Sequence, residues 1–211
     1  MDLRILSFAA FFICSVADLI SCAKGNARGE RIAKPFLMPL LLCYYVLSAP
    51  VPNSLLIAAL VCGFLGDTFL LGSGAWFLCG LASFLAGHLF YTAAFLQPLV
   101  LGAVPAAIWA AVPVYAGFAF AACRFLLPSV QKKLRPAIVT YMVCLLAMSF
   151  AALLRCGYAS GAAFWMPFSG SLLFVASDTM LAFQIFQKKS GSGVMITYLL
   201  AQFLIVSGFL A

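Results

Sequence analysis

The sequence predicts an all-α protein, a polytopic transmembrane helix bundle of about eight spans. Hydrophobic residues make up 66% of the 211 residues and charged residues only 8%, and the mean hydropathy is strongly positive. A soluble domain of this length could not bury so much apolar surface. The apolar runs are unbroken and close to 20 residues long, as spanning helices require, whereas spanning strands would alternate over about 10 residues.

Eight apolar runs follow one another along the chain. The first is full-length and lacks a small-residue cleavage site, so we expect a retained span and not a signal peptide. Pro35 opens the second run and Pro136 the sixth, while Pro105 and Pro113 interrupt the fifth and predict a kink there. The expected spans cover residues 3–22, 35–48, 54–71, 75–95, 100–127, 136–154, 164–186 and 194–210.

The regions between the spans are too short for a separate domain, so we expect residues 1–211 to form a single integral membrane domain. Two internal similarities suggest a parallel duplication with four spans in each half. The basic residue and proline before the second span recur before the sixth, and the segment around Asp67 resembles the segment around Asp178. Both pairs lie four spans apart.

The basic residues gather in a few short loops, as topology determinants do, and not in a nucleic-acid-binding patch. The loops after the first, third, fifth and seventh spans hold ten of the 12 Lys and Arg; only Arg4 and Arg155 lie on the other side. The positive-inside rule predicts that these loops are cytoplasmic and that both termini lie outside. The chain has no N-x-S/T glycosylation acceptor, which favours a multi-pass protein of a bacterial inner membrane. The oligomeric state stays open.

Two aspartates stand in matching contexts inside apolar runs. Asp67 and Asp178 each follow a small residue and precede a threonine. A charged side chain in hydrocarbon costs about 2.5–3.5 kcal/mol, which makes such a residue a functional-site hypothesis. The alternative is a structural hydrogen bond to a neighbouring helix, but the matching frames favour function. Two carboxylates in one low-dielectric site cannot both ionise easily, so one would stay protonated while the other acts as a base.

A third acid and the single histidine extend this hypothesis. Asp18 shares a polar face of the first span with Ser7, Cys14 and Ser21. The three acids predict a polar cavity opening toward the inner leaflet, with His88 near its floor. His88 is either a core histidine bonded to a carbonyl or a proton donor or phosphate contact. One histidine with scattered cysteines gives no zinc ligand set, so we expect no metal and no other cofactor.

Further polar residues have two explanations each. Tyr91 shares a helix face with the histidine three residues before it. Tyr198 and Gln202 are four residues apart in the last span, and Tyr141 lies in the sixth; helix–helix hydrogen bonds would explain all three equally well. Lys34 lies near the membrane surface, where it would either extend toward water or meet a lipid phosphate.

The eight cysteines lie almost wholly within the apolar runs and never form a C-x-x-C pair. We interpret them as small packing residues and not as disulfides or a metal cluster. The sequence also lacks a P-loop, a G-x-S-x-G motif and a Cys-His pair placed for nucleophilic catalysis.

Together these residues resemble the pattern of the YhhN-like family, the lysoplasmalogenases. The family pattern places Lys-Pro before the second span, Gly-Asp at the end of the third, His-x-x-Tyr in the fourth, Phe-x-x-Ser-Asp in the seventh, and Tyr and Gln in the last. Here the matching residues are Lys34-Pro35, Gly66-Asp67, His88 with Tyr91, Phe174 to Asp178, and Tyr198 with Gln202. The match covers nearly the whole chain.

The resemblance implies a hydrolase that cleaves the vinyl ether bond of a lysoplasmalogen. The products would be a fatty aldehyde and a glycerophosphoethanolamine or glycerophosphocholine, and the partners would be a lysophospholipid substrate and the bilayer. Asp67 and Asp178 would share the acid and base roles. Substrate-binding or supporting roles would belong to His88, Tyr91, Lys34, Tyr141, Ser177, Tyr198 and Gln202.

A proton-coupled transporter of small molecules or lipids is the main alternative, because buried acids and a parallel duplication would suit it as well. A transporter would move its ligand unchanged, whereas a hydrolase in detergent would release product without any gradient. In a purely structural membrane subunit, the acids would serve only as contacts between helices.

Overall fold

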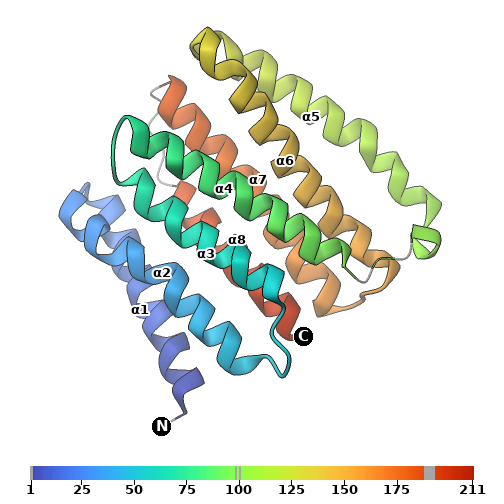
Figure 1. Ribbon diagram of the computed structural model, residues 1–211, viewed down its shortest axis with the longest axis horizontal. Coiled ribbons are helices and arrows are strands. Elements are labelled where there is room, and N and C mark those ends of the chain that lie inside the picture. The colour runs from blue at the N-terminus through green and yellow to red at the C-terminus, as the bar shows by residue number, and fades with distance from the viewer. Residues whose placement is uncertain (1, 98, 100, 188–192) are drawn as a thin grey trace. The chain divides into compact units, whose positions relative to one another are not determined.

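A computed structural model describes residues 2–97, 99, 101–187 and 193–211. The predicted basic pair Lys188 and Lys189 lies outside the described residues. The regular secondary structure of the described residues is helical, as the sequence predicts (Figure 1). The α-helices are α1 (Leu3–Ala23), α2 (Ala27–Ser48), α3 (Ser54–Leu70), α4 (Ala75–Leu96), α5 (Ala111–Leu126), α6 (Arg135–Leu154), α7 (Ala162–Gln187) and α8 (Gly193–Leu210).

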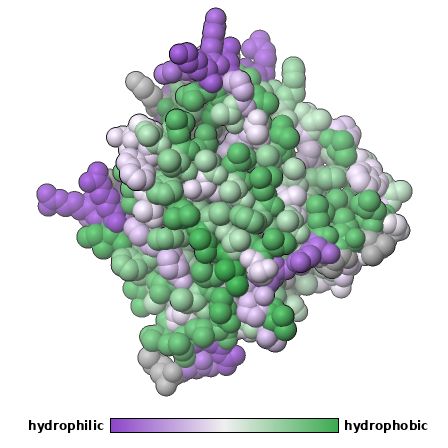
Figure 2. Space-filling model, in the orientation of Figure 1, coloured by the Kyte–Doolittle hydropathy of each residue, from purple (hydrophilic) through white to green (hydrophobic). Residues whose placement is uncertain are grey.

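Seven of the described helical segments are long and apolar enough to cross a membrane, and α3 is a shorter apolar helix of 17 residues. Figure 2 shows that hydrophobic residues cover most of the face in view, while hydrophilic residues gather in a few separate places. These observations confirm the prediction of an all-α polytopic bundle.

The second helix begins earlier than predicted. α2 starts at Ala27, because the side chain of Asn26 accepts a hydrogen bond from the backbone N–H of Gly29 (3.3 Å) and caps the helix. Pro35, the predicted start, lies inside the helix together with Pro39. Membrane helices tolerate such prolines when other groups satisfy the freed carbonyls. Much of the predicted first basic loop is therefore the first turns of α2.

The fifth span also differs from its prediction. A 3₁₀-helix covers Ala106–Ala110 and leads into α5 at Ala111. Pro105 precedes the 3₁₀ turn, and Pro113 lies in the first turn of α5, where the missing N–H group has no intrahelical partner to lose. The fifth span therefore changes from 3₁₀ to α geometry at the place where we expected a kink.

The helices divide into two compact units, residues 1–94 with Leu210 and residues 95–209 with Ala211. The first unit contains α1 to α3 and nearly all of α4, and the second contains α5 to α7 and nearly all of α8. The boundary lies four spans into the chain, where the predicted duplication would place it. The duplication and the single integral domain both stay predictions.

Close backbone approach organises the first unit. The backbone N–H of Asn53 donates to the Tyr45 hydroxyl (2.8 Å), which ties the end of α2 to the start of α3. Glycines then bring α3 and α4 together. A Cβ at Gly66 would lie 2.6 Å from the Phe84 ring, and a Cβ at Gly80 would lie 3.3 Å from the Gly66 carbonyl oxygen. Small residues at helix contacts are a common packing device in membrane bundles.

Hydroxyl groups connect three helices of the second unit. The Tyr115 hydroxyl of α5 lies 2.9 Å from the Ser149 Oγ of α6, and this oxygen lies 3.0 Å from the Ser171 Oγ of α7. Both serines are fully buried. Their hydrogen bonds offset the cost of placing hydroxyls in an apolar interior. The three linked hydroxyl groups thus hold α5, α6 and α7 together.

A buried arginine lies between α6 and α7 in the second unit. Arg155 donates to the Tyr158 hydroxyl and to the Ala163 carbonyl oxygen, both at 3.0 Å. Its guanidinium carbon also lies 4.7 Å from the ring centre of Phe209 and 5.6 Å from that of Phe95. Burial raises the pKa of the Tyr158 hydroxyl, which stays protonated and donates to the Phe95 carbonyl oxygen. Cation–π contacts and hydrogen bonds thus enclose the charge.

Candidate functional site

Asp67 is buried in the last turn of α3, with 2% of its surface exposed. The close approach of α3 to α4 at Gly66 fixes the backbone next to it. The hydroxyl of the following residue, Thr68, donates a hydrogen bond to the Phe64 carbonyl oxygen of the same helix (2.8 Å). The first predicted aspartate is therefore buried next to a close contact between two helices.

His88 and Tyr91 lie on α4 in the same unit, and each is 1% exposed. Their spacing of three residues places them on one helix face, and burial of both shows that this face points into the protein. The backbone carbonyl of His88 accepts a hydrogen bond from the Thr92 hydroxyl (2.7 Å). The interior of the first unit thus contains an acid, an imidazole and a phenol.

Asp18 is the most isolated of the buried acids. It lies on α1 with 0% of its surface exposed, and neither carboxyl oxygen has a hydrogen-bond partner among the described residues. The charged groups that act on it include Lys34, which is half-buried on α2, and Glu30. Of the predicted polar face of α1, Ser7 is also buried, while Cys14 and Ser21 are half-buried.

The isolation of Asp18 leads to a stability prediction. A buried polar group without a hydrogen bond costs about 1–3 kcal/mol, so Asp18→Leu should raise the free energy of unfolding by a similar amount. Thermal unfolding in detergent measures the change. Ser15→Ala on the same helix face is the control, with an expected change below about 0.5 kcal/mol. A lower melting temperature for Asp18→Leu would instead reveal a favourable interaction of the carboxyl, for example with Lys34.

Asp178 has a direct partner in the second unit. The Tyr141 hydroxyl of α6 donates to the Asp178 Oδ2 of α7 over 2.5 Å, although the two residues are 37 positions apart in the sequence. Both side chains are half-buried. Tyr141 therefore fixes the orientation of the second predicted aspartate.

The remaining predicted residues join α7 to α8. The buried Ser177 hydroxyl donates to the Val194 carbonyl oxygen at the start of α8 (3.0 Å). Tyr198 packs edge-on against Phe174 of α7 with ring centres 5.5 Å apart. The Gln202 amide lies 3.4 Å from the Tyr198 hydroxyl within α8, a long hydrogen bond. Ser177 and Tyr198 thus join the helix that carries Asp178 to α8, whereas the bond between Gln202 and Tyr198 lies within α8.

Two groupings of the predicted residues therefore emerge, one in each unit. The first unit contains Asp67, His88, Tyr91 and Lys34. The second unit contains Asp178, Tyr141, Ser177, Tyr198 and Gln202. A site that uses both aspartates stays a prediction. All eight cysteines are free thiols in the structure. Within the described part of the chain, no group of three or more His, Cys, Asp or Glu side chains could hold a metal ion.

Comparison with known proteins gives two matches. Residues 29–209 match the YhhN family. The chain is also similar to "Lysoplasmalogenase TMEM86B" of Sus scrofa, with 37% identity over 151 residues, which cover 70% of this chain and 59% of the relative. The chain thus spans well under two thirds of that relative's length. No solved structure matches the chain significantly.

Proposed function

Because the chain belongs to the YhhN family, we propose that it is a membrane-embedded hydrolase that cleaves the vinyl ether bond of lysoplasmalogens. Its products are a fatty aldehyde and glycerophosphoethanolamine or glycerophosphocholine. The name of the similar Sus scrofa protein supports this activity. The observation that carries the proposal is the pair of membrane-embedded aspartates, one buried on α3 and one oriented by Tyr141 on α7.

The reaction needs one acid and one base. A protonated carboxyl donates its proton to the β-carbon of the vinyl ether, which leaves an oxocarbenium ion on the carbon bonded to oxygen. The second, ionised carboxylate stabilises this cation and takes a proton from the water that attacks it. The resulting hemiacetal collapses to the aldehyde and the free glycerol hydroxyl, so one water is consumed for each bond cleaved. We assign these two roles jointly to Asp67 and Asp178.

The other predicted residues support substrate binding. We propose that Lys34 holds the lipid phosphate and that His88 and Tyr91 orient the water or the substrate. The half-buried position of Lys34 on the first turns of α2 suits an ammonium that extends toward a headgroup. Asp178 and its helix are positioned by Tyr141, Ser177, Tyr198 and Gln202.

We further propose that the protein lies in a bacterial inner membrane with its basic loops in the cytoplasm.

Three single-chain lipids with the same headgroup test the proposal. Purified protein in detergent receives a vinyl ether, a saturated alkyl ether or an acyl ester. Only the vinyl ether has a carbon that can accept a proton to give an oxocarbenium ion, so aldehyde should appear from this lipid alone. Well-folded protein that releases no aldehyde would contradict the proposal. Uptake of unchanged lipid into proteoliposomes under a proton gradient would instead support the transporter.

Tyr141→Phe tests the orientation of Asp178. The change removes one hydrogen bond to a carboxylate and keeps the ring, so kcat for the vinyl ether should fall about 10- to 100-fold with little change in KM. Tyr158→Phe is the matched control, because it removes a buried hydroxyl that contacts Phe95 and Arg155 in the same unit. It should lower stability and leave kcat nearly unchanged. Equal kcat losses in both variants would assign Tyr141 a purely structural role.

A further inference from the structure

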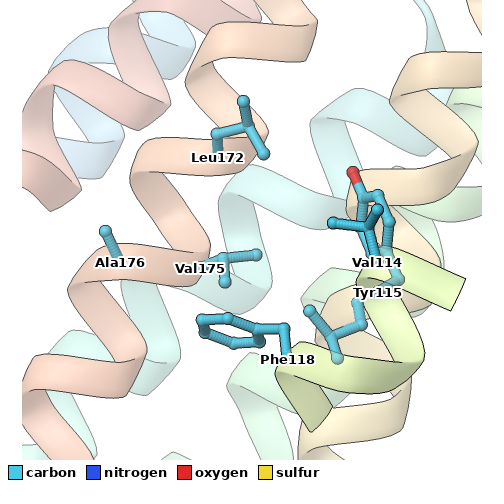
Figure 3. A pocket seen from close by; sticks show the side chains of 7 residues that line it. Val114, Tyr115, Phe118, Leu172, Val175 and Ala176 are labelled. Carbon is cyan, nitrogen blue, oxygen red and sulfur yellow. The ribbon is translucent and has the colours of Figure 1, made fainter. Parts of the chain in front are cut away.

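An apolar groove lies in the second unit between α5 and α7 (Figure 3). Its volume is about 260 Å³. The lining comes from three helices: Val114, Tyr115 and Phe118 of α5, Leu146 of α6, and Leu172, Val175 and Ala176 of α7. In Figure 3, the rings of α5 and the aliphatic side chains of α7 face one another across the space.

The lining offers hydrocarbon surface to an occupant. Its one side-chain polar group is the Tyr115 hydroxyl, which is bonded to Ser149 (2.9 Å) and so presents mainly the ring to the groove. No lining residue is charged, so a lipid phosphate has no partner here. The surface chemistry therefore matches an alkyl or alkenyl chain and excludes a headgroup.

The groove is also open at its side. Leu172 is 44% exposed and Phe118 is 40% exposed, although both line it. In a membrane-spanning bundle, such exposed apolar surface faces lipid tails. A hydrocarbon chain can thus enter from the bilayer without passing through water.

One row of α7 connects the groove with the proposed catalytic carboxyl. Val175, which lines the groove, lies three residues before Asp178, so these two side chains are neighbours on the surface of α7. Asp178 lies about 4.5 Å farther along the helix axis than Val175, at 1.5 Å per residue. A chain in the groove thus has one end close to the level of the Asp178 carboxyl.

We propose that this groove holds the hydrocarbon chain of the single-chain lipid substrate, with the vinyl ether end directed toward Asp178. The inference rests on the proposed function, because it assigns the chain-binding part of that site. The groove then sets chain-length preference, whereas the aspartates perform the chemistry. Ordinary bilayer lipid and a second copy of the protein are the competing occupants.

A binding experiment tests the occupant without any turnover. Phe118→Trp places a fluorophore in the groove, and a saturated alkyl ether lysolipid with a brominated chain serves as quencher. Phe120→Trp is the matched control, because Phe120 lies on the same helix, is 74% exposed and does not line the groove. We expect saturable quenching of Trp in the groove variant at a lysolipid fraction about tenfold lower than in the control.

Three results would overturn the proposal. Equal quenching curves for the two probes would show no preferred site for the chain. Equal quenching by a brominated diacyl phospholipid would show that ordinary bilayer lipid occupies the groove. Quenching that disappears on dimer formation, measured by light scattering, would assign the surface to a second copy.

A second variant connects the groove with activity. Ala176→Phe should fill the space, abolish the saturable quenching of Trp at position 118, and raise KM for long-chain vinyl ether lysolipids about tenfold more than for short-chain ones. Ala147→Phe, at an exposed position of α6 outside the groove, is the control and should change neither the quenching nor KM.

If wild-type protein cleaves no vinyl ether but still shows saturable quenching, the proposed function fails while the proposed chain-binding site stands. Cleavage with unchanged chain-length preference in Ala176→Phe would overturn the chain site alone.

Discussion

Asp67→Asn and Asp178→Asn should each lower kcat for the vinyl ether about 10²- to 10⁴-fold, the contribution of one general acid or base. Asparagine has nearly the same shape as aspartate, but it can neither deliver a carboxyl proton nor carry the negative charge that stabilises an oxocarbenium ion. In Asp178→Asn, the amide oxygen can still accept the bond from the Tyr141 hydroxyl, so the local structure should survive. Aldehyde release at saturating substrate measures the loss.

The double variant and a control separate catalysis from folding. Because the two carboxyls act in one reaction, the double variant should lose little more than the worse single variant. Glu30→Gln removes an acid in the first turn of α2 and should keep activity within about threefold. Thermal unfolding identifies any misfolded variant. Full turnover in a well-folded Asp67→Asn or Asp178→Asn variant would disprove the two-carboxylate mechanism.

Gly208→Val should destabilise the protein by about 3 kcal/mol or more, the upper range for overpacking. A Cβ at Gly208 would lie 2.2 Å from Pro167 Cδ and 3.0 Å from the Pro167 backbone nitrogen. The proline ring is part of α7 and cannot rotate away, so α7 and α8 would have to separate. Thermal unfolding in detergent measures the change, and Gly170→Val should act in the same direction because its Cβ would lie 2.8 Å from the Ala201 carbonyl oxygen.

Gly117→Val is the matched control for the glycine contacts. Gly117 also lies inside a helix, but a Cβ there would meet no other atom within 4 Å. Its expected effect stays within about 0.5 kcal/mol, the usual range for a surface change. Equal destabilisation by Gly208→Val and Gly117→Val would show that the contact with Pro167 does not determine the result.

The helices were predictable because hydrocarbon thickness and hydropathy determine their number and length. Their starts were less predictable where proline and polar caps compete. Pro35 is a good first residue for a helix, but the Asn26 cap begins α2 eight residues earlier. Similarly, Pro113 indicated a kink from sequence alone, whereas in the structure it lies in the first turn of α5.

The candidate site shows a different limit. Asp67 and Asp178 were identifiable because acids are rare and costly in apolar runs. The bond from Tyr141 to Asp178 was not, because the register between α6 and α7 depends on many side-chain contacts. The same holds for the hydroxyl chain through Ser149 and Ser171, which resemble ordinary small residues until the helices pack.

The burial of Arg155 affects which lipids gather around the protein in each leaflet of the membrane. A solvated arginine gains about 1 kcal/mol from anionic headgroups, but this guanidinium is buried and contacts Tyr158, Ala163 and the ring of Phe209 instead. In the proposed orientation, its loop faces the outer leaflet and recruits no anionic lipid there. The exposed basic residues at the start of α2 and around Lys132 can do so from the inner leaflet. Enrichment of anionic lipid around the protein should therefore be one-sided and sensitive to salt.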